Sequence, residues 1–126
     1  MLNWSSNRFL TENILNADPT IEIVTLALDA TLMRQTAIAN NVANINSNGY
    51  QTIEVNFEQQ LNEMYPHATH EDLASIKPFY QPAKEQSSID EQMALNVQNM
   101  THYRALIKGL NQKFAIMKLA LQGTNQ

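Results

Sequence analysis

The sequence predicts an elongated all-α protein built around two long helices, one in each half of the chain. Apolar residues recur at steps of three or four over the last third of the chain, and a second stretch with this spacing covers residues 18–46. The chain has 126 residues, which suits one domain, and its 3 glycines and 4 prolines are too few for a turn-dense all-β fold. We therefore expect one domain, 1–126, made of an N-terminal segment 1–17, a long helix 18–46, a connection 47–87 and a long helix 88–122.

The C-terminal helix, 88–122, begins at a capping box. Ser88 and Glu91 have the spacing at which each side chain accepts a hydrogen bond from the backbone N–H of the other residue. After Glu91 every charged residue is basic, as the helix macrodipole favours toward a C-terminus. The apolar spacing predicts a coiled-coil-like seam along this helix. The predicted seam residues are Met93, Val97, Met100, Tyr103, Ile107, Leu110, Phe114, Met117 and Leu121.

The other long helix, 18–46, begins with the residue types that open helices. Asp18 suits the N-cap, and Pro19 suits the first helical position, where its missing N–H costs nothing. Apolar residues then continue at three-four spacing toward residue 46. We expect Leu28 and Ile38 to contribute this helix's side of the seam.

Charge is scarce around this first helix. Between residues 23 and 53 only Asp29 and Arg34 are charged, whereas a helix with one wet face normally carries a charged side. Over the whole chain, 15 asparagines and 11 glutamines outnumber the 20 charged residues. Two helices cannot enclose each other, so each is expected to keep an outer apolar flank that other subunits must cover.

The connection, 47–87, is expected to hold little regular structure. Gly49 follows the helix end, where a glycine can adopt the left-handed conformation that ends many helices, with Tyr50 packing back on Ile45. Residues 55–65 fit a short helix, and residues 66–87, with three prolines, fit a long irregular loop. Residues 1–17 are ambiguous, with a short helix around 9–15 as one option.

The overall charge and residue composition exclude several classes of function. The chain carries 8 basic and 12 acidic residues, a net charge of −4, so its field repels nucleic-acid backbones. It has no cysteine, which excludes disulfides and thiolate metal sites. Its start lacks the pattern of a cleaved signal peptide, and no apolar run reaches the ~18 residues needed to cross a membrane.

Two histidines offer the one catalytic alternative. His67 and His70, with the neighbouring Glu71 and Asp72, are residue types that bind zinc or nickel. No distant third ligand or fixed scaffold accompanies them, so a solvated loop with incidental histidines is favoured. We therefore expect no catalytic residue, no metal and no cofactor, and a metal-dependent enzyme is the alternative that bound metal would support.

The end of the first helix carries a recognisable motif. Residues 39–50 read Ala-Asn-Asn-Val-Ala-Asn-Ile-Asn-Ser-Asn-Gly-Tyr. This stretch resembles the signature of the bacterial flagellar rod and hook family, Ala-Asn-Asn-Ile-Ala-Asn-Ala-Asn-Thr-Pro-Gly-Tyr. Shorter matches at 28–30, 34–35, 56–58 and 80–82 and in the last helix extend the resemblance over most of the chain. Ser47 and Asn48 stand where the family has Thr-Pro, which makes this turn less rigid.

The resemblance implies a structural, non-catalytic subunit of the basal-body rod, polymerising through its terminal helices into the axial drive shaft for motility. Residues 66–87 are too few for the extra β domain of hook and distal rod members, which favours a proximal rod subunit. Family members are exported by the flagellar type III apparatus without a cleaved signal and lie in the periplasmic rod. The implied partners are copies of the chain, other rod proteins, the membrane-ring adaptor and the export apparatus, with no nucleic acid and no small-molecule substrate.

The motif also indicates candidate assembly residues. Asn40, Asn41 and Asn44 lie on a helix of low charge, where an amide can bond buried polar groups at a subunit contact without the desolvation cost of a charge. Alternatively, these amides only shape the helix end. The expected assembly residues are Asn40, Asn41, Val42, Asn44, Ile45, Asn46, Gly49 and Tyr50. A soluble helical adaptor or secretion chaperone, working as a small oligomer, is the competing function.

Overall fold

The computed structural model describes residues 5, 8, 18–64, 66, 67 and 69–123. The helix considered around residues 9–15 lies outside them. The elements follow in the order α2 (Pro19–Asn44), β1 (Ile53–Asn56), α3 (Glu58–Met64), α4 (His70–Ser75), β2 (Phe79–Pro82) and α5 (Ile89–Gly123).

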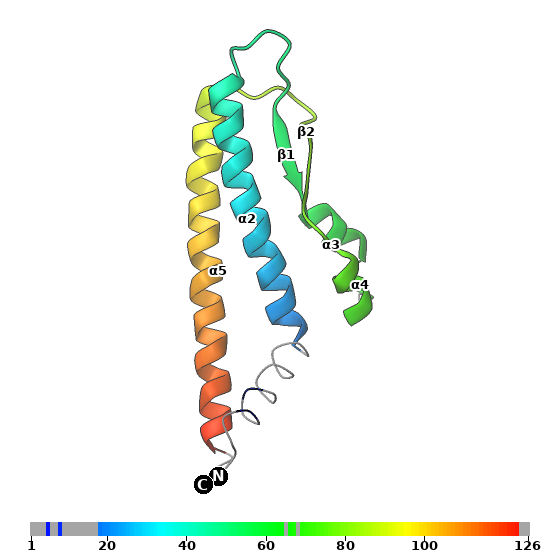
Figure 1. Ribbon diagram of the computed structural model, residues 1–126, viewed down its shortest axis with the longest axis vertical. Helices are drawn as coiled ribbons and strands as arrows, with labels where there is room; N and C mark the ends of the chain where they lie inside the picture. Colours follow the sequence, from blue (N-terminus) through cyan, green and yellow to red (C-terminus); the bar gives the residue numbers. More distant parts are fainter. Residues whose placement is uncertain (1–4, 6–7, 9–17, 65, 68, 124–126) are drawn as a thin grey trace.

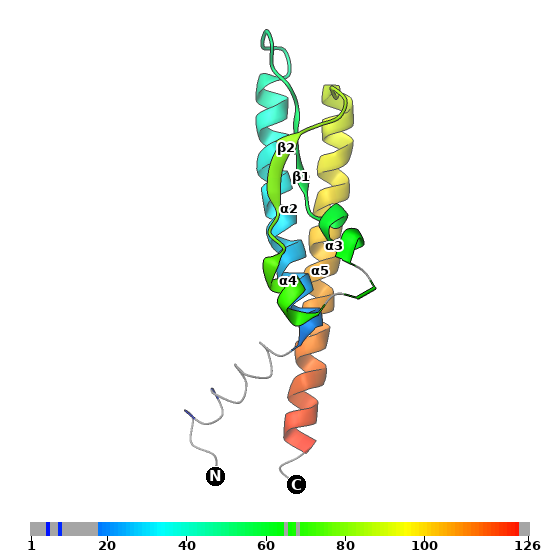
Figure 2. The same cartoon turned by 90° about the vertical axis from the view of Figure 1, so that its right-hand side faces the viewer.

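Two long antiparallel helices form the body of the molecule (Figure 1). α2 has 26 residues and α5 has 35, so they are about 39 and 52 Å long at 1.5 Å per residue. α5 begins beside the end of α2 and continues past the start of α2 (Figures 1 and 2). β1, β2, α3 and α4 lie along one side of this pair, and the molecule is elongated, as the sequence predicts.

Both long helices begin at the caps that the sequence indicates. Asp18 is the N-cap of α2, and its carboxylate accepts a hydrogen bond from the Thr20 N–H at 2.9 Å. At the start of α5, the Ser88 N–H donates to Glu91 Oε2 at 3.0 Å and the Glu91 N–H donates to Ser88 Oγ at 3.2 Å. Lys113 Nζ lies 3.2 Å from Asp18 Oδ2 and joins the start of α2 to the far half of α5.

The prediction of a purely helical fold is wrong in the connection, which contains a two-stranded antiparallel sheet. β1 pairs with β2 so that Ile53 faces Pro82. The Ala83 N–H donates to the Thr52 carbonyl at 2.9 Å, so the next pair along, Ile53 and Pro82, falls at a position that makes no ladder hydrogen bonds. The missing N–H of Pro82 therefore costs the sheet nothing.

The connection is also less irregular than predicted between residues 66 and 87. α4 occupies part of the expected loop and begins at a capping box, in which the Asp72 N–H donates to Thr69 Oγ1 and the Thr69 N–H donates to Asp72 Oδ2. α3 lies inside the short helix expected at 55–65, whose first residues belong to β1 instead. Short-range capping thus orders a segment too brief to show a helical period.

α2 ends at Asn44, two residues before the predicted boundary. Gly49 has a φ of 75° and occupies the third position of a turn closed by the Tyr50 N–H donating to the Ser47 carbonyl at 3.2 Å. A left-handed glycine at this position is typical of a type II turn. The expectation that Gly49 directly caps the helix is therefore wrong, because the C-cap of α2 is Ile45 and Gly49 belongs to a separate turn that follows it.

The hydrophobic core lies between α2 and the connection, not between the two long helices. Small residues of α2 let Phe57 and the end of α4 pack closely against the helix backbone. The buried members of this cluster are Ala27, Ala30, Ala37, Val55, Phe57, Leu73 and Ile76. α2 is therefore covered from two directions, by this layer and by α5.

Candidate assembly site

Asn41 is the best-connected side chain of the motif. It is 1% exposed, and its Nδ2 donates to the Ile53 carbonyl at 2.9 Å and to Gln92 Oε1 at 3.1 Å. Its Oδ1 accepts from the Ile53 N–H at 3.0 Å and from the Tyr50 hydroxyl at 2.7 Å. An amide has two donor hydrogens and two acceptor lone pairs, so all four positions are used.

This amide joins three parts of the fold. By bonding both the N–H and the C=O of Ile53, Asn41 pairs with β1 as a neighbouring strand would. The bond to Gln92 adds the first turns of α5, and the bond to Tyr50 adds the turn. Asn41 was expected at a subunit contact, but a buried amide with no free donor or acceptor has nothing to offer a neighbour. Its role in the described structure is intramolecular.

The other two motif asparagines lie nearer the surface. Asn44 Nδ2 donates to the Asn40 carbonyl at 2.8 Å and to Asn40 Oδ1 at 3.1 Å. Asn40 Nδ2 in turn donates to the Tyr50 hydroxyl at 3.1 Å. Asn40 is exposed, so its role in a subunit contact stays a prediction. The remaining motif residues are half-buried, as Val42 and Ile45 are, or exposed, as Asn46 and Gly49 are.

A second side-chain amide, that of Gln86, bonds the backbone just before β1, a contact that the sequence analysis missed. Gln86 Nε2 donates to the Tyr50 carbonyl at 3.0 Å, while Gln86 Oε1 accepts from the Thr52 N–H at 3.1 Å. Thr52 is fully buried and also bonds the Glu85 carbonyl through its hydroxyl. Side-chain amides thus continue the pairing where the strands end, and no local sequence pattern announces that contact.

The face of α5 that contacts α2 differs from the predicted seam. Gln92 and Asn99 are the only buried residues in α5, and Asn99 Nδ2 donates to the Thr31 carbonyl at 2.8 Å. Leu106, which packs against the core cluster, and Lys113 continue the same seven-residue spacing. A heptad pattern that includes amides would have found this face.

In the first turns of α5 the apolar spacing instead marks an exposed face. Met93 is 50% exposed and Val97 is 64% exposed, so the predicted intramolecular seam is wrong for them and for Met100. Tyr103, Phe114 and Leu121 are exposed as well, whereas Ile107, Leu110 and Met117 are half-buried. On α2, Ile38 is buried and Leu28 is half-buried. We call Ile89, Met93, Val97 and Met100 the α5 stripe.

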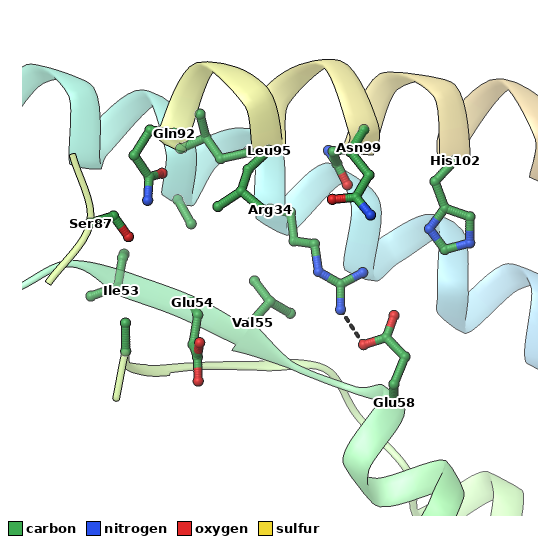
Figure 3. Close-up of a pocket in the computed structure, with 14 residues that line it drawn as sticks. Arg34, Ile53, Glu54, Val55, Glu58, Ser87, Gln92, Leu95, Asn99 and His102 are labelled. Carbon is green, nitrogen blue, oxygen red and sulfur yellow. Dashed lines mark hydrogen bonds and ion pairs between the residues drawn. The ribbon is translucent and has the colours of Figure 1, made fainter. Parts of the chain in front are cut away.

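A groove of about 570 Å³ separates β1 from α5, with α2 behind it (Figure 3). Arg34 and Glu58 form an ion pair at one end of it. Gln92 and Asn99 line its α5 wall, and Asn99 Oδ1 is buried without a hydrogen-bond partner. Ile38 and Val55 also line the groove, so it combines apolar side chains with a hydrogen-bond acceptor that has no donor.

Two carboxyl groups of the described residues, Asp18 and Asp72, have a lowered pKa, and both lie outside this groove. Partial desolvation acts to raise the pKa of Asp18, but hydrogen bonds from Lys113 and from the Thr20 N–H hold it below its ordinary 3.8. The Thr69 N–H and hydroxyl lower the pKa of Asp72. Both groups cap helices, so the shifts reflect structure and not catalysis.

The described residues contain no cluster of three or more histidine or acidic side chains placed to hold a metal ion. His67 is exposed, and the side chain of His70 lies outside the described part. None of the described helices combines the length and apolar content needed to cross a membrane.

Comparison with known proteins agrees with the motif. No family model matches the chain. The chain is 29% identical over 121 residues to the flagellar basal body rod protein FlgB of Bacillus subtilis (strain 168), an alignment that covers 82% of this chain and 94% of the relative. That name describes a structural rod component and no enzyme, in agreement with the prediction of no catalysis. The similarity supports the resemblance to the flagellar rod family that residues 39–50 indicate.

Proposed function

We propose that this chain is a structural subunit of the proximal rod of the bacterial flagellar basal body, a counterpart of FlgB. In this role it polymerises through α2 and α5 into the tubular axial shaft and performs no catalysis. The observation that carries the proposal is the composition of α5, whose buried residues are amides while most of its large apolar residues are exposed.

The arrangement of α5 is the reverse of that in a self-sufficient domain. Of the thirteen large hydrophobic residues exposed among the described residues, ten lie on α5. Exposed apolar patches of this extent mark surfaces that bind other proteins. The ten are Ile89, Met93, Leu95, Val97, Met100, Tyr103, Phe114, Ile116, Leu119 and Leu121. Because they surround much of the helix, several neighbours are needed to cover it, as in a tube.

The similarity to a rod protein supports the cellular setting that we propose. The chain would act in the periplasm after export by the flagellar type III apparatus without cleavage of a signal. Its partners would be copies of itself, other rod proteins and the membrane-ring adaptor. The exposed Asn40 and the half-buried Asn44 lie at one end of the helix pair, where they can meet such neighbours.

The α5 stripe offers a direct test. The double variant Met93→Ser, Val97→Ser should keep the helical circular-dichroism signal of the monomer, because both side chains are exposed. It should abolish rod assembly and motility when it replaces the natural chain in the source bacterium. Lys77→Ser, on the exposed connection between α4 and β2, is the control and should leave motility unchanged.

The competing function predicts a different result. An adaptor or chaperone would form a closed small oligomer in solution, and the stripe variant would change its size without loss of a rod. Normal basal bodies in cells that carry the stripe variant would contradict the proposed function.

A further inference from the structure

The groove between β1 and α5 contains an acceptor that needs a donor. Asn99 is 8% exposed, and its Nδ2 bonds the Thr31 carbonyl, which fixes the orientation of the amide because a carbonyl can only accept. Asn99 Oδ1 has no hydrogen-bond partner and is covered by neighbouring atoms of the groove wall, so a donor that enters the groove reaches it only when those atoms move aside. A buried, unpaired acceptor costs stability, and an arriving N–H or ammonium group would remove that cost.

The charges that line the groove also favour the binding of a basic side chain. Glu54 of β1 and Glu58 at the start of α3 line it, and Arg34, which is paired with Glu58, is the one lysine or arginine among the lining residues (Figure 3). The lining thus keeps one excess negative charge, with Ile38 and Val55 as apolar floor. A basic residue flanked by apolar side chains would match both features.

The C-terminal half of α5 has this composition. From Gln92 onward the chain has no acidic residue and four basic ones, of which Lys113 is paired with Asp18. Lys108, Ile116 and Leu119 are all exposed and share one side of α5 at helical spacing. Helical geometry places that side opposite the Asn99 and Leu106 face, so it points away from α2.

We propose that this groove receives the C-terminal half of α5 from a second copy of the chain, with Lys108 or Arg104 of that copy donating to Asn99 Oδ1 and facing Glu54. The inference rests on the proposed function, because it names one contact within the polymer. Groove and helix are different surfaces, so the contact is head-to-tail and leaves a free groove and a free helix for the next copies.

Disulfide trapping tests the contact, since the natural chain has no cysteine. Gln98→Cys places a thiol at the groove, and Gln112→Cys places one on the proposed visiting face; both positions are exposed. Mixed under oxidation, the two single variants should give more of the 98–112 heterodimer than random pairing allows. The double variant should give a ladder of multimers. Glu63→Cys, on α3 outside the groove, is the control partner for Gln112→Cys and should give random pairing.

A charge variant provides the second measurement. Glu54→Gln keeps the acceptor that Gln81 Nε2 uses but removes the charge, so it should weaken self-association measured by sedimentation roughly two- to fivefold. Glu63→Gln is the matched control, since its carboxylate also accepts from a glutamine amide but lies outside the groove. Equal effects of the two variants, or only random cross-linking, would overturn the proposal.

The outcomes separate this inference from the proposed function. Rod assembly that depends on the α5 stripe, without the 98–112 disulfide, rejects the groove contact and leaves the function standing. The disulfide ladder together with normal basal bodies in stripe-variant cells supports the contact and rejects the rod function. Filling of the groove by water or by a different rod protein would appear as random cross-linking of this chain with itself.

Discussion

α2 and α5 are both long α-helices that lie side by side, yet they are stabilised in different ways. α2 buries a row of alanines against the two-stranded sheet and α4 on one side and packs against α5 on the other. Among the described elements α5 packs mainly on α2 and buries only Gln92 and Asn99, while most of its large apolar residues are exposed. The difference shows that the buried apolar cluster of the monomer is built on α2, and that α5 is tied to it largely by polar contacts: the side-chain hydrogen bonds of Gln92 and Asn99 and the ion pair of Lys113.

Paired phenylalanine truncations should show this contrast most strongly. Phe57 is 3% exposed in the core cluster, so Phe57→Ala should cost about 3–5 kcal/mol of unfolding free energy. Phe114 is 39% exposed on α5, so the same change there should cost roughly 1 kcal/mol or less in the monomer. Urea unfolding of the two variants measures both values. Similar losses at the two sites would show that α5 has a covered face which the monomer structure lacks.

Replacing Asn41 should have the next largest effect on stability. Asn41→Leu leaves the Ile53 N–H and C=O and the Tyr50 hydroxyl without their partner, so we expect a loss of about 2–4 kcal/mol. Asn40→Ala, one residue away and exposed, should cost roughly 0.5–1 kcal/mol. Thermal melts followed by circular dichroism compare the two. If both variants melt alike, the four bonds of Asn41 do not stabilise the fold.

Acid should have the smallest effect, and it acts at the starts of α2 and α4. The pKa values of Asp18 and Asp72 lie below the ordinary 3.8, so their stabilisation is complete above that pH and is lost as the pH falls through the lower folded-state values. The helical signal should therefore decline below about pH 3.8. Asp18→Asn with Asp72→Asn should flatten this part of the profile relative to the natural chain. An identical acid transition in both proteins would assign it to other carboxylates.

Local chemistry in the sequence was enough to place the starts of both long helices. Asp18 with Pro19 and Ser88 with Glu91 act within a single turn, so their roles do not depend on distant contacts. The two-stranded sheet requires residues 53–56 to pair with residues 79–82. Strands of four residues are too short to predict such a pairing. The sequence therefore predicts helix starts well and long-range pairs poorly.

The facing of α5 could not be predicted from hydrophobic spacing. That method assumes that apolar residues lie inside, whereas here Gln92 and Asn99 face α2 and Val97 faces outward. Likewise, Asn41 stands within an asparagine-rich motif whose members look alike in sequence. Only the approach of Ile53 and Gln92 makes it different from the exposed Asn40. Burial of polar groups depends on the assembled fold and not on the pattern.

The way in which Asn41 binds β1 also affects how copies of the chain can meet. A two-stranded sheet normally leaves two open edges, each able to recruit a strand from another molecule and begin disordered aggregation. Asn41 occupies the Ile53 backbone on the edge of β1 that β2 leaves open, so strand recruitment is blocked at this point. On this edge of the sheet, contacts between copies through their exposed helix surfaces therefore do not compete with strand pairing at Ile53.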